Sequence, residues 1–159
     1  MSFTEQDVYF MKLAFEEATR AFDRDEVPIG AVVVSENGVI LGRGYNCPIS
    51  SNDPTAHAEI IAIREASSYE KNYRLLGSTL YVTLEPCLMC YGAMVHARIK
   101  RLVFGAFDKR SGITSHLELI DKLNLNHKVE IEGGLLAEEC GKLLTDFFEL
   151  KRKMKKESK

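Results

Sequence analysis

The chain has 159 residues, of which 45% are hydrophobic, enough for one domain with its own core. Its formal net charge of −2 at pH 7 argues against a generally basic nucleic-acid binder. We expect a cytoplasmic protein that does not cross a membrane, because it shows neither a signal peptide nor the roughly 18 to 20 apolar residues of a membrane span.

The N-terminal part predicts a helix followed by a hairpin. Residues 4–24 place apolar side chains at helical spacing, and Thr4 and Asp7 stand where a capping box begins a helix. Residues 29–35 and 39–46 are rich in β-branched side chains and are separated by a short loop that contains Asn-Gly. We therefore expect two antiparallel strands after the first helix.

The middle of the chain predicts a helix and then a strand-helix-strand unit. Helical periodicity covers 55–67, after a turn-forming Asn-Asp-Pro. We expect a strand over 78–85, and Pro86 opens a helix to residue 97, because proline is tolerated in the first helical turn. The next strand, over 101–107, follows in a right-handed parallel crossover.

The C-terminal part completes the predicted fold. It holds a short helix within 116–123, a fifth strand over 128–134 and a long amphipathic helix over 135–156. The elements together predict an α/β fold, a three-layer α/β/α sandwich with a five-stranded mixed sheet. We expect one domain over 1–150 and a basic C-terminal helix end over 151–159.

The charge is unevenly distributed. The last ten residues hold six basic residues and one acid, so the preceding 149 hold 15 basic and 22 acidic residues, a net charge of −7. A basic end on an acidic molecule allows one local phosphate-binding patch. A solvated helix end, with lysines near the negative end of the helix dipole, accounts equally well for the charge alone.

Two cysteines lie three residues apart in the stretch Pro86-Cys87-Leu88-Met89-Cys90. The cytoplasm keeps thiols reduced, so closely spaced cysteines indicate metal ligands or a redox pair before a structural disulfide. At a helix start, the positive end of the dipole favours the thiolate, and a softer metal such as zinc suits it. Cys47 and Cys140 have no partner at a telling spacing, and we expect them to be ordinary packed or half-exposed thiols.

A second group of residues favours a metal site over a redox pair for these cysteines. His57-Ala58-Glu59 places an imidazole at the start of another helix and a carboxylate two residues later. A catalytic zinc site needs three protein ligands and an open position for water, and His57, Cys87 and Cys90 supply the three. Glu59 then remains free to exchange protons with that water. The alternative makes His57 a core histidine and Glu59 a surface acid.

These residues carry a family resemblance. His-x-Glu followed by Pro-Cys-x-x-Cys resembles the signature of the zinc-dependent nucleoside and nucleobase deaminases. The chain is similar to the bacterial tRNA adenosine deaminases over nearly its whole length, in the stretches EVPIGAVVV, NCPIS, DPTAHAEI, NYRL, TLYVTLEPCLMCYGAM, RLVFGAFD and NHKVEI. The resemblance implies a cytidine-deaminase-like fold, which agrees with the predicted sandwich.

The resemblance also implies a reaction. One zinc ion per subunit would be bound by His57, Cys87 and Cys90, and Glu59 would transfer protons during hydrolysis of adenosine to inosine. The implied substrate is the wobble adenosine of an arginine tRNA with an ACG anticodon, recognised in its anticodon stem-loop. Family members are homodimers, so we expect a homodimer with helices near the metal site at its interface.

The same resemblance implies three substrate contacts, each with an alternative. Asn46 would contact the flipped base, or it is a turn-forming residue. Asp108 would accept a hydrogen bond from a ribose 2′-OH next to the target, or it caps the following turn. Phe148 would stack on a base while Phe147 packs against the sheet, or both belong to the core. Basic residues after residue 150 would contact phosphates along the stem.

Two other functions fit the same motifs. A free-base deaminase acting on guanine or cytosine would share the zinc chemistry, although it would leave the basic end without a role. A non-catalytic RNA-binding subunit would use zinc only for structure, although it would not need Glu59. We assign no role to His96, His116 and His127 beyond solvent exposure or structural hydrogen bonds.

Overall fold

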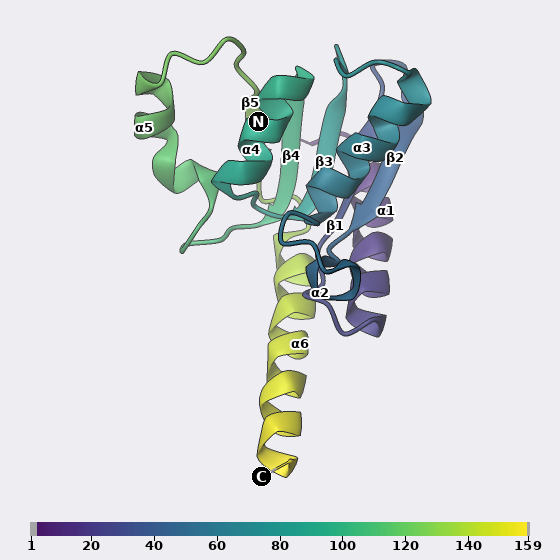
Figure 1. Cartoon of the computed structure of the whole chain (residues 1–159), viewed down its shortest axis with the longest axis vertical. Helices are drawn as coiled ribbons and strands as arrows, with labels where there is room; N and C mark the ends of the chain where they lie inside the picture. The colour runs from purple at the N-terminus through teal and green to yellow at the C-terminus, as the bar shows by residue number, and fades with distance from the viewer. Residues whose placement is uncertain (1–2, 159) are drawn as a thin grey trace.

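A five-stranded mixed sheet runs through the middle of the computed structural model, which describes residues 3–158 (Figure 1). Its strands are β1 (Gly30–Val34), β2 (Ile40–Tyr45), β3 (Thr79–Leu84), β4 (Arg101–Ala106) and β5 (Glu130–Gly133). They lie in the order β2-β1-β3-β4-β5. β1 pairs antiparallel with both β2 and β3, whereas β3, β4 and β5 pair in parallel. The predicted hairpin and parallel crossover are therefore confirmed.

Helices cover both faces of this sheet. They are α1 (Glu5–Asp23), α2 (Pro48–Ser51), α3 (Ala58–Glu70), α4 (Leu88–Ala97), the 3-10 turn η1 (Ile113–His116), α5 (Leu117–Lys122) and α6 (Ala137–Glu157). α3, α4 and α5 pack on one face, and α1 with the start of α6 packs on the other. Alternate residues of β1 serve the two faces, because Val33 joins the first core and Val32 the second. The predicted three-layer sandwich is confirmed.

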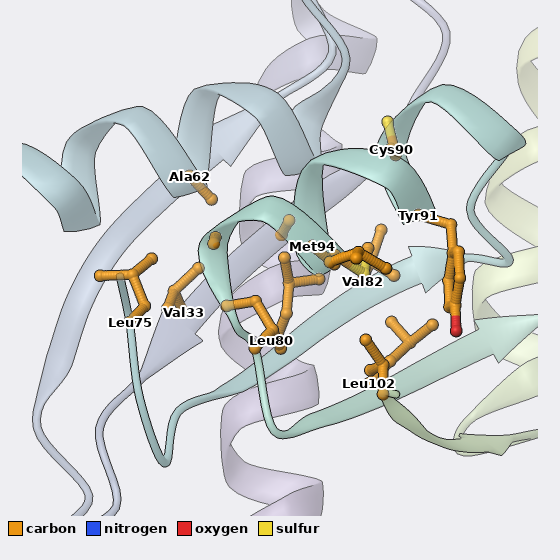
Figure 2. Close-up of a cluster of buried hydrophobic side chains, with 14 of the residues drawn as sticks. Val33, Ala62, Leu75, Leu80, Val82, Cys90, Tyr91, Met94 and Leu102 are labelled. Atoms are coloured by element: carbon orange, nitrogen blue, oxygen red, sulfur yellow. The ribbon is translucent and has the colours of Figure 1, made fainter. Parts of the chain in front are cut away.

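The core under α3 and α4 holds these helices against the strands. Figure 2 shows Ala62 of α3 and Met94 of α4 in one cluster with Val33, Val82 and Leu102 of the sheet. All five side chains are fully buried. This packing matters for function because the N-termini of α3 and α4 carry the predicted metal ligands.

α3 approaches β2 so closely that two strand positions accept only glycine. A Cβ atom on Gly42 would lie 2.3 Å from the Ala62 carbonyl oxygen, and one on Gly44 would lie 2.4 Å from the Ala58 carbonyl oxygen. Real Cβ atoms essentially never come within 3.0 Å of a heavy atom outside their own and the adjacent residues. The two glycines therefore set the depth at which the start of α3 lies on the sheet.

The capping box at the start of α1 is confirmed and extends into a larger network. Thr4 and Asp7 exchange backbone-to-side-chain hydrogen bonds of 3.0 Å, and Asp7 also accepts hydrogen bonds from Arg101 and Tyr81. Burial alone would raise the pKa of Asp7, but the hydrogen bond from Arg101 and the others hold it well below its usual range. This network ties α1 to the amino ends of β3 and β4.

Three predicted helix starts were wrong by two or three residues: besides those of α3 and α4, α6 begins at Ala137 rather than residue 135. α4 begins at Leu88 rather than Pro86, and Cys87 is its extended N-cap residue. The Pro86 carbonyl accepts a hydrogen bond from the Ile113 amide, so it does not join the helical ladder. α3 likewise begins at Ala58 rather than residue 55, with His57 as its N-cap residue.

α6 runs without a break across residue 150 to Glu157, and its second half projects away from the sheet (Figure 1). The domain boundary placed at residue 150 stays a prediction. Within residues 3–158, no helix combines the length and apolar character needed to cross a bilayer.

Candidate metal centre and adjoining groove

Three potential metal ligands meet where α3 and α4 begin. His57 Nδ1 lies 3.7 Å from Cys87 Sγ and 3.4 Å from Cys90 Sγ, and the ligand atoms of all three lie within 4.8 Å of one another. Tetrahedral zinc with bonds of about 2.0 to 2.3 Å would separate such nitrogen and sulfur atoms by about 3.6 Å. One imidazole and two thiolates at this spacing fit a zinc ion with a fourth position free.

The helix starts orient these ligands. Cys87 and His57 are both extended N-cap residues, so each side chain leaves the backbone at the positive end of a helix dipole. Hydrogen bonding from Cys90, and further from His57, lowers the pKa of Cys87 to about 4. The same pairing raises the pKa of Cys90. The sulfur pair therefore carries a thiolate at neutral pH, which is the form that binds metal.

Glu59 lies beside this cluster as the second residue of α3 and is only 4% exposed. Burial raises its pKa to about 7, although a backbone hydrogen bond and the charge of His57 act in the opposite direction. A carboxyl group with a pKa near neutrality can both accept and return a proton at physiological pH. The alternative of a surface acid is therefore wrong for Glu59.

Two of the three predicted substrate contacts share one groove. An open groove of about 560 Å³ is lined by Asp108 and Phe148, together with Val27, Leu84, Phe107, Lys109, Arg110, Ser111 and Leu144. Leu84 ends β3, three residues before Cys87. Asn46 is outside this lining but lies near the metal cluster, because the adjacent Cys47 amide donates to the carbonyl of Ala56.

The side chains at the groove differ in how far they are already buried or hydrogen-bonded within the protein. Phe147 is buried and packs edge-on against Phe22 of α1, whereas Phe148 is 44% exposed, so the two do not both belong to the core. The Asp108 carboxylate accepts backbone hydrogen bonds from Arg110 and Ser111, so it does cap the following turn. Its other oxygen accepts the Ser111 hydroxyl at 3.2 Å. A carboxylate has about four acceptor sites, so one remains for a further donor.

Two buried carboxylates that bond segments distant in the sequence were not found by the sequence analysis. Glu26 accepts hydrogen bonds from the Ile49 and Ser50 amides and so caps α2, a helix that was not predicted. Glu85 accepts hydrogen bonds from the segment that follows β4. The available signal was the position of Glu85, an acid at the end of an apolar strand immediately before Pro-Cys.

The remaining cysteines and histidines are packed, hydrogen-bonded to the backbone or exposed to solvent. Cys47 is half-buried and Cys140 is buried, where burial raises its thiol pKa to about 12. His127 Nε2 lies 2.7 Å from the Ile99 carbonyl oxygen, and His96 and His116 are exposed. These positions agree with the expectation of packed thiols, structural hydrogen bonds and solvent exposure.

The family model for the cytidine and deoxycytidylate deaminase zinc-binding region matches residues 4–106. This range contains the His/Cys/Cys cluster and Glu59. The chain therefore belongs to the zinc-binding cytidine and deoxycytidylate deaminase family and is an enzyme of that class.

Individual relatives and solved structures are also similar to the chain. The tRNA-specific adenosine deaminase of Haemophilus influenzae is 51% identical over 154 residues, which cover 96% of this chain and 89% of the relative. A solved structure of a tRNA:A34 deaminase, from work on A-to-I editing at the wobble position, matches with 43% identity and a TM-score of 0.80 over 85% of this chain and 98% of that one. The guanine deaminase of Bacillus subtilis matches with 32% identity and a TM-score of 0.61, over 91% of this chain and 92% of that one. In sequence and fold, this chain resembles the tRNA-specific adenosine deaminases.

Proposed function

We propose that this protein hydrolyses adenosine to inosine at the wobble position of an arginine tRNA with an ACG anticodon. The observation that carries the proposal is the cluster of His57, Cys87 and Cys90 with the buried Glu59 beside it, in a chain half identical to a tRNA-specific adenosine deaminase. We assign one zinc ion per subunit to the three ligands. Zinc bound there supplies hydroxide near neutral pH.

Glu59 performs the proton transfers in this proposal. Its carboxylate takes the proton released when water becomes the nucleophile and delivers it to N1 of adenine, which makes C6 more electrophilic. After the C6–O bond forms, Glu59, deprotonated again, takes the remaining proton of the new C6 hydroxyl group and gives it to the departing amino group. The C6–N bond then breaks, and water and adenosine have become ammonia and inosine. The raised pKa of about 7 suits a group that must gain and lose a proton in each cycle.

The groove and α6 supply the proposed RNA contacts. Asn46, 5% exposed, would pair with the flipped base through its amide, and Asp108 would accept a hydrogen bond from a neighbouring ribose. The exposed ring of Phe148 offers a face for stacking. Lys151 already forms an ion pair with Asp25, so the exposed basic residues of α6 are the better phosphate contacts: Arg152, Lys153, Lys155 and Lys156.

A homodimer is part of the same proposal. An apolar cleft beside the metal cluster is formed by α3 and α4 and contains Ile60, Leu88 and Met89. Leu88 is 53% and Met89 38% exposed in the single chain. Burying this surface between two copies would remove it from water. We place the protein in the cytoplasm, where reduced thiols remain available as metal ligands.

The test uses an unmodified arginine tRNA transcript with an ACG anticodon. Purified protein is incubated with it, and cDNA is sequenced for an A-to-G change at the wobble position, with Glu59→Ala in parallel. Conversion by the wild type alone supports the proposal. No conversion by protein with a full zinc content, together with release of ammonia from free guanine or cytosine, would instead make the protein a free-base deaminase.

A further inference from the structure

Glu85 is a buried carboxylate that the proposed reaction does not use. It is 3% exposed and follows β3, immediately before Pro86 and Cys87. Its Oε1 accepts the Asp108 amide at 2.9 Å, and its Oε2 accepts both the amide of Thr114, at 2.6 Å, and the hydroxyl of that residue. Both ends of the segment 108–114 therefore bond to this one side chain.

The segment is shaped around that carboxylate. The Gly112 amide donates to the Asp108 carbonyl at 2.9 Å, which closes the segment into a turn. A Cβ atom on Gly112 would lie 2.2 Å from the carboxyl carbon of Glu85. Glycine is the residue that leaves room for Glu85 beneath the turn. The Ile113 amide, in addition, donates to the carbonyl of Pro86.

All three groups that bond to Glu85 are neutral donors, and none of the ion pairs within residues 3–158 includes it. Burying a carboxylate without a cation is unfavourable unless hydrogen bonds replace its hydration. An apolar side chain would fill the same space without that penalty. What the carboxylate adds is direction, because it fixes the orientation of the Asp108 and Thr114 amides.

The fixed segment forms one wall of the groove. The groove is lined by Asp108, Lys109, Arg110 and Ser111 of this segment, together with Leu144 and Phe148 of α6. Asp108 is held twice, because Glu85 fixes its amide while its own carboxylate caps the turn that follows. The direction in which Asp108 presents its remaining acceptor site thus depends on Glu85.

We propose that Glu85 is a positioning residue that holds Asp108 toward the groove and thereby sets the preference for RNA over single-stranded DNA. This inference rests on the proposed function, in which Asp108 contacts a ribose 2′-OH. Glu85 touches neither substrate nor metal in this scheme and acts through the segment 108–114. Loosening that segment weakens a contact that only RNA can make.

The test compares Glu85→Gln with the wild type in the zinc-loaded, full-length protein. The amide matches the carboxylate in shape but presents an NH₂ group to a donor that previously had an acceptor. Binding of an RNA anticodon stem-loop and its DNA counterpart is measured by fluorescence anisotropy, with Glu59→Ala in every protein to prevent turnover. We expect the Kd for RNA to rise about tenfold and the Kd for DNA to change less than twofold. Equal weakening of both ligands, or loss of zinc from Glu85→Gln, would overturn the proposal.

Two further variants separate positioning from general destabilisation. Asp7→Asn is the matched control, because Asp7 is another buried carboxyl group that accepts several hydrogen bonds, but it lies at the opposite end of the strands. It should lower thermal stability and leave the RNA-to-DNA ratio unchanged. In an Asp108→Ala background, Glu85→Gln should change the Kd for RNA less than twofold. A repeated tenfold change there would show that Glu85 acts by another route and would refute the inference.

Amide hydrogen exchange tests, without any substrate, whether Glu85 fixes the segment 108–114. The Asp108 and Thr114 amides should exchange faster in Glu85→Gln than in the wild type. Unchanged exchange would refute the claim that Glu85 fixes these two amides. This outcome is independent of tRNA conversion, so failure of the proposed function is distinguishable from failure of this inference. If Glu85→Gln does not fold, Thr114→Val removes the hydroxyl donor alone and should shift the RNA-to-DNA ratio in the same direction.

Discussion

A methyl group added at Gly44 is expected to damage the metal centre by displacing the start of α3. Gly44 lies on β2 beneath the first turn of α3, and its added Cβ would meet the Ala58 carbonyl oxygen at 2.4 Å and the Ala62 amide nitrogen at 2.7 Å. Both neighbours are backbone atoms, so neither can move by a side-chain rotation. Ala58 stands between His57 and Glu59, and a shift of its backbone moves both.

The size of the shift follows from these distances. Ordinary van der Waals contact begins at 3.4 Å, so an atom at 2.4 Å must give way by about 1 Å. Overpacking of this kind costs about 1 to 3 kcal/mol of folding stability. A misplacement of about 1 Å at the reacting groups costs about a hundredfold in rate. Gly44→Ala should therefore lose far more activity than its stability change alone explains.

The assay measures kcat/KM on the tRNA transcript, zinc content and thermal unfolding of Gly44→Ala. The matched control is Gly141→Ala in α6, where the nearest heavy atom to an added Cβ lies at 3.9 Å. The control should keep its activity and gain about 0.5 to 1 kcal/mol from the better helix former. The reasoning fails if Gly44→Ala unfolds within a degree of the wild type and keeps its activity within twofold.

Four further outcomes follow from individual side chains. Glu59→Gln should retain zinc and lose about a hundredfold or more in kcat. A Gln variant with a near-normal rate would contradict the proton-transfer role. Cys87→Ala, in contrast, should lose the metal, as measured by elemental analysis. Asp108→Asn should gain activity on single-stranded DNA, measured by sequencing, because the amide relieves a carboxylate next to the backbone phosphates. Asp7→Asn should cost about 3 kcal/mol at pH 7 in denaturant unfolding. The pKa of Asp7 is lowered by folding, so that difference should shrink as the pH falls below 3.8, and a pH-independent difference would contradict the network.

Local patterns were enough to predict the type and order of nearly every element. Helical spacing in α1, β-branched runs in β1 and β3, and the Asn-Gly loop each act over a few residues, so each leaves a mark in the sequence. The metal cluster was predictable for the same reason, because the spacing of Cys87 and Cys90 is a local feature at a helix start. His57, at the start of another predicted helix, then supplied the third ligand that a catalytic zinc site needs, and the resemblance to a known family agreed with this choice.

Only the tertiary structure decided features that depend on partners distant in sequence. Glu26 caps α2 from 23 residues away, and Glu85 holds an amide 29 residues away, so no local pattern predicts either contact. The start of α4 moved to Leu88 because a remote amide bonds the Pro86 carbonyl. The sequence by itself determined the layers of this protein and which residues are the candidate metal ligands and the proposed acid-base carboxylate. The depth of α3 on the sheet, the pKa of Glu59 and the wall of the groove were decided by packing, since each depends on atoms that only folding brings together.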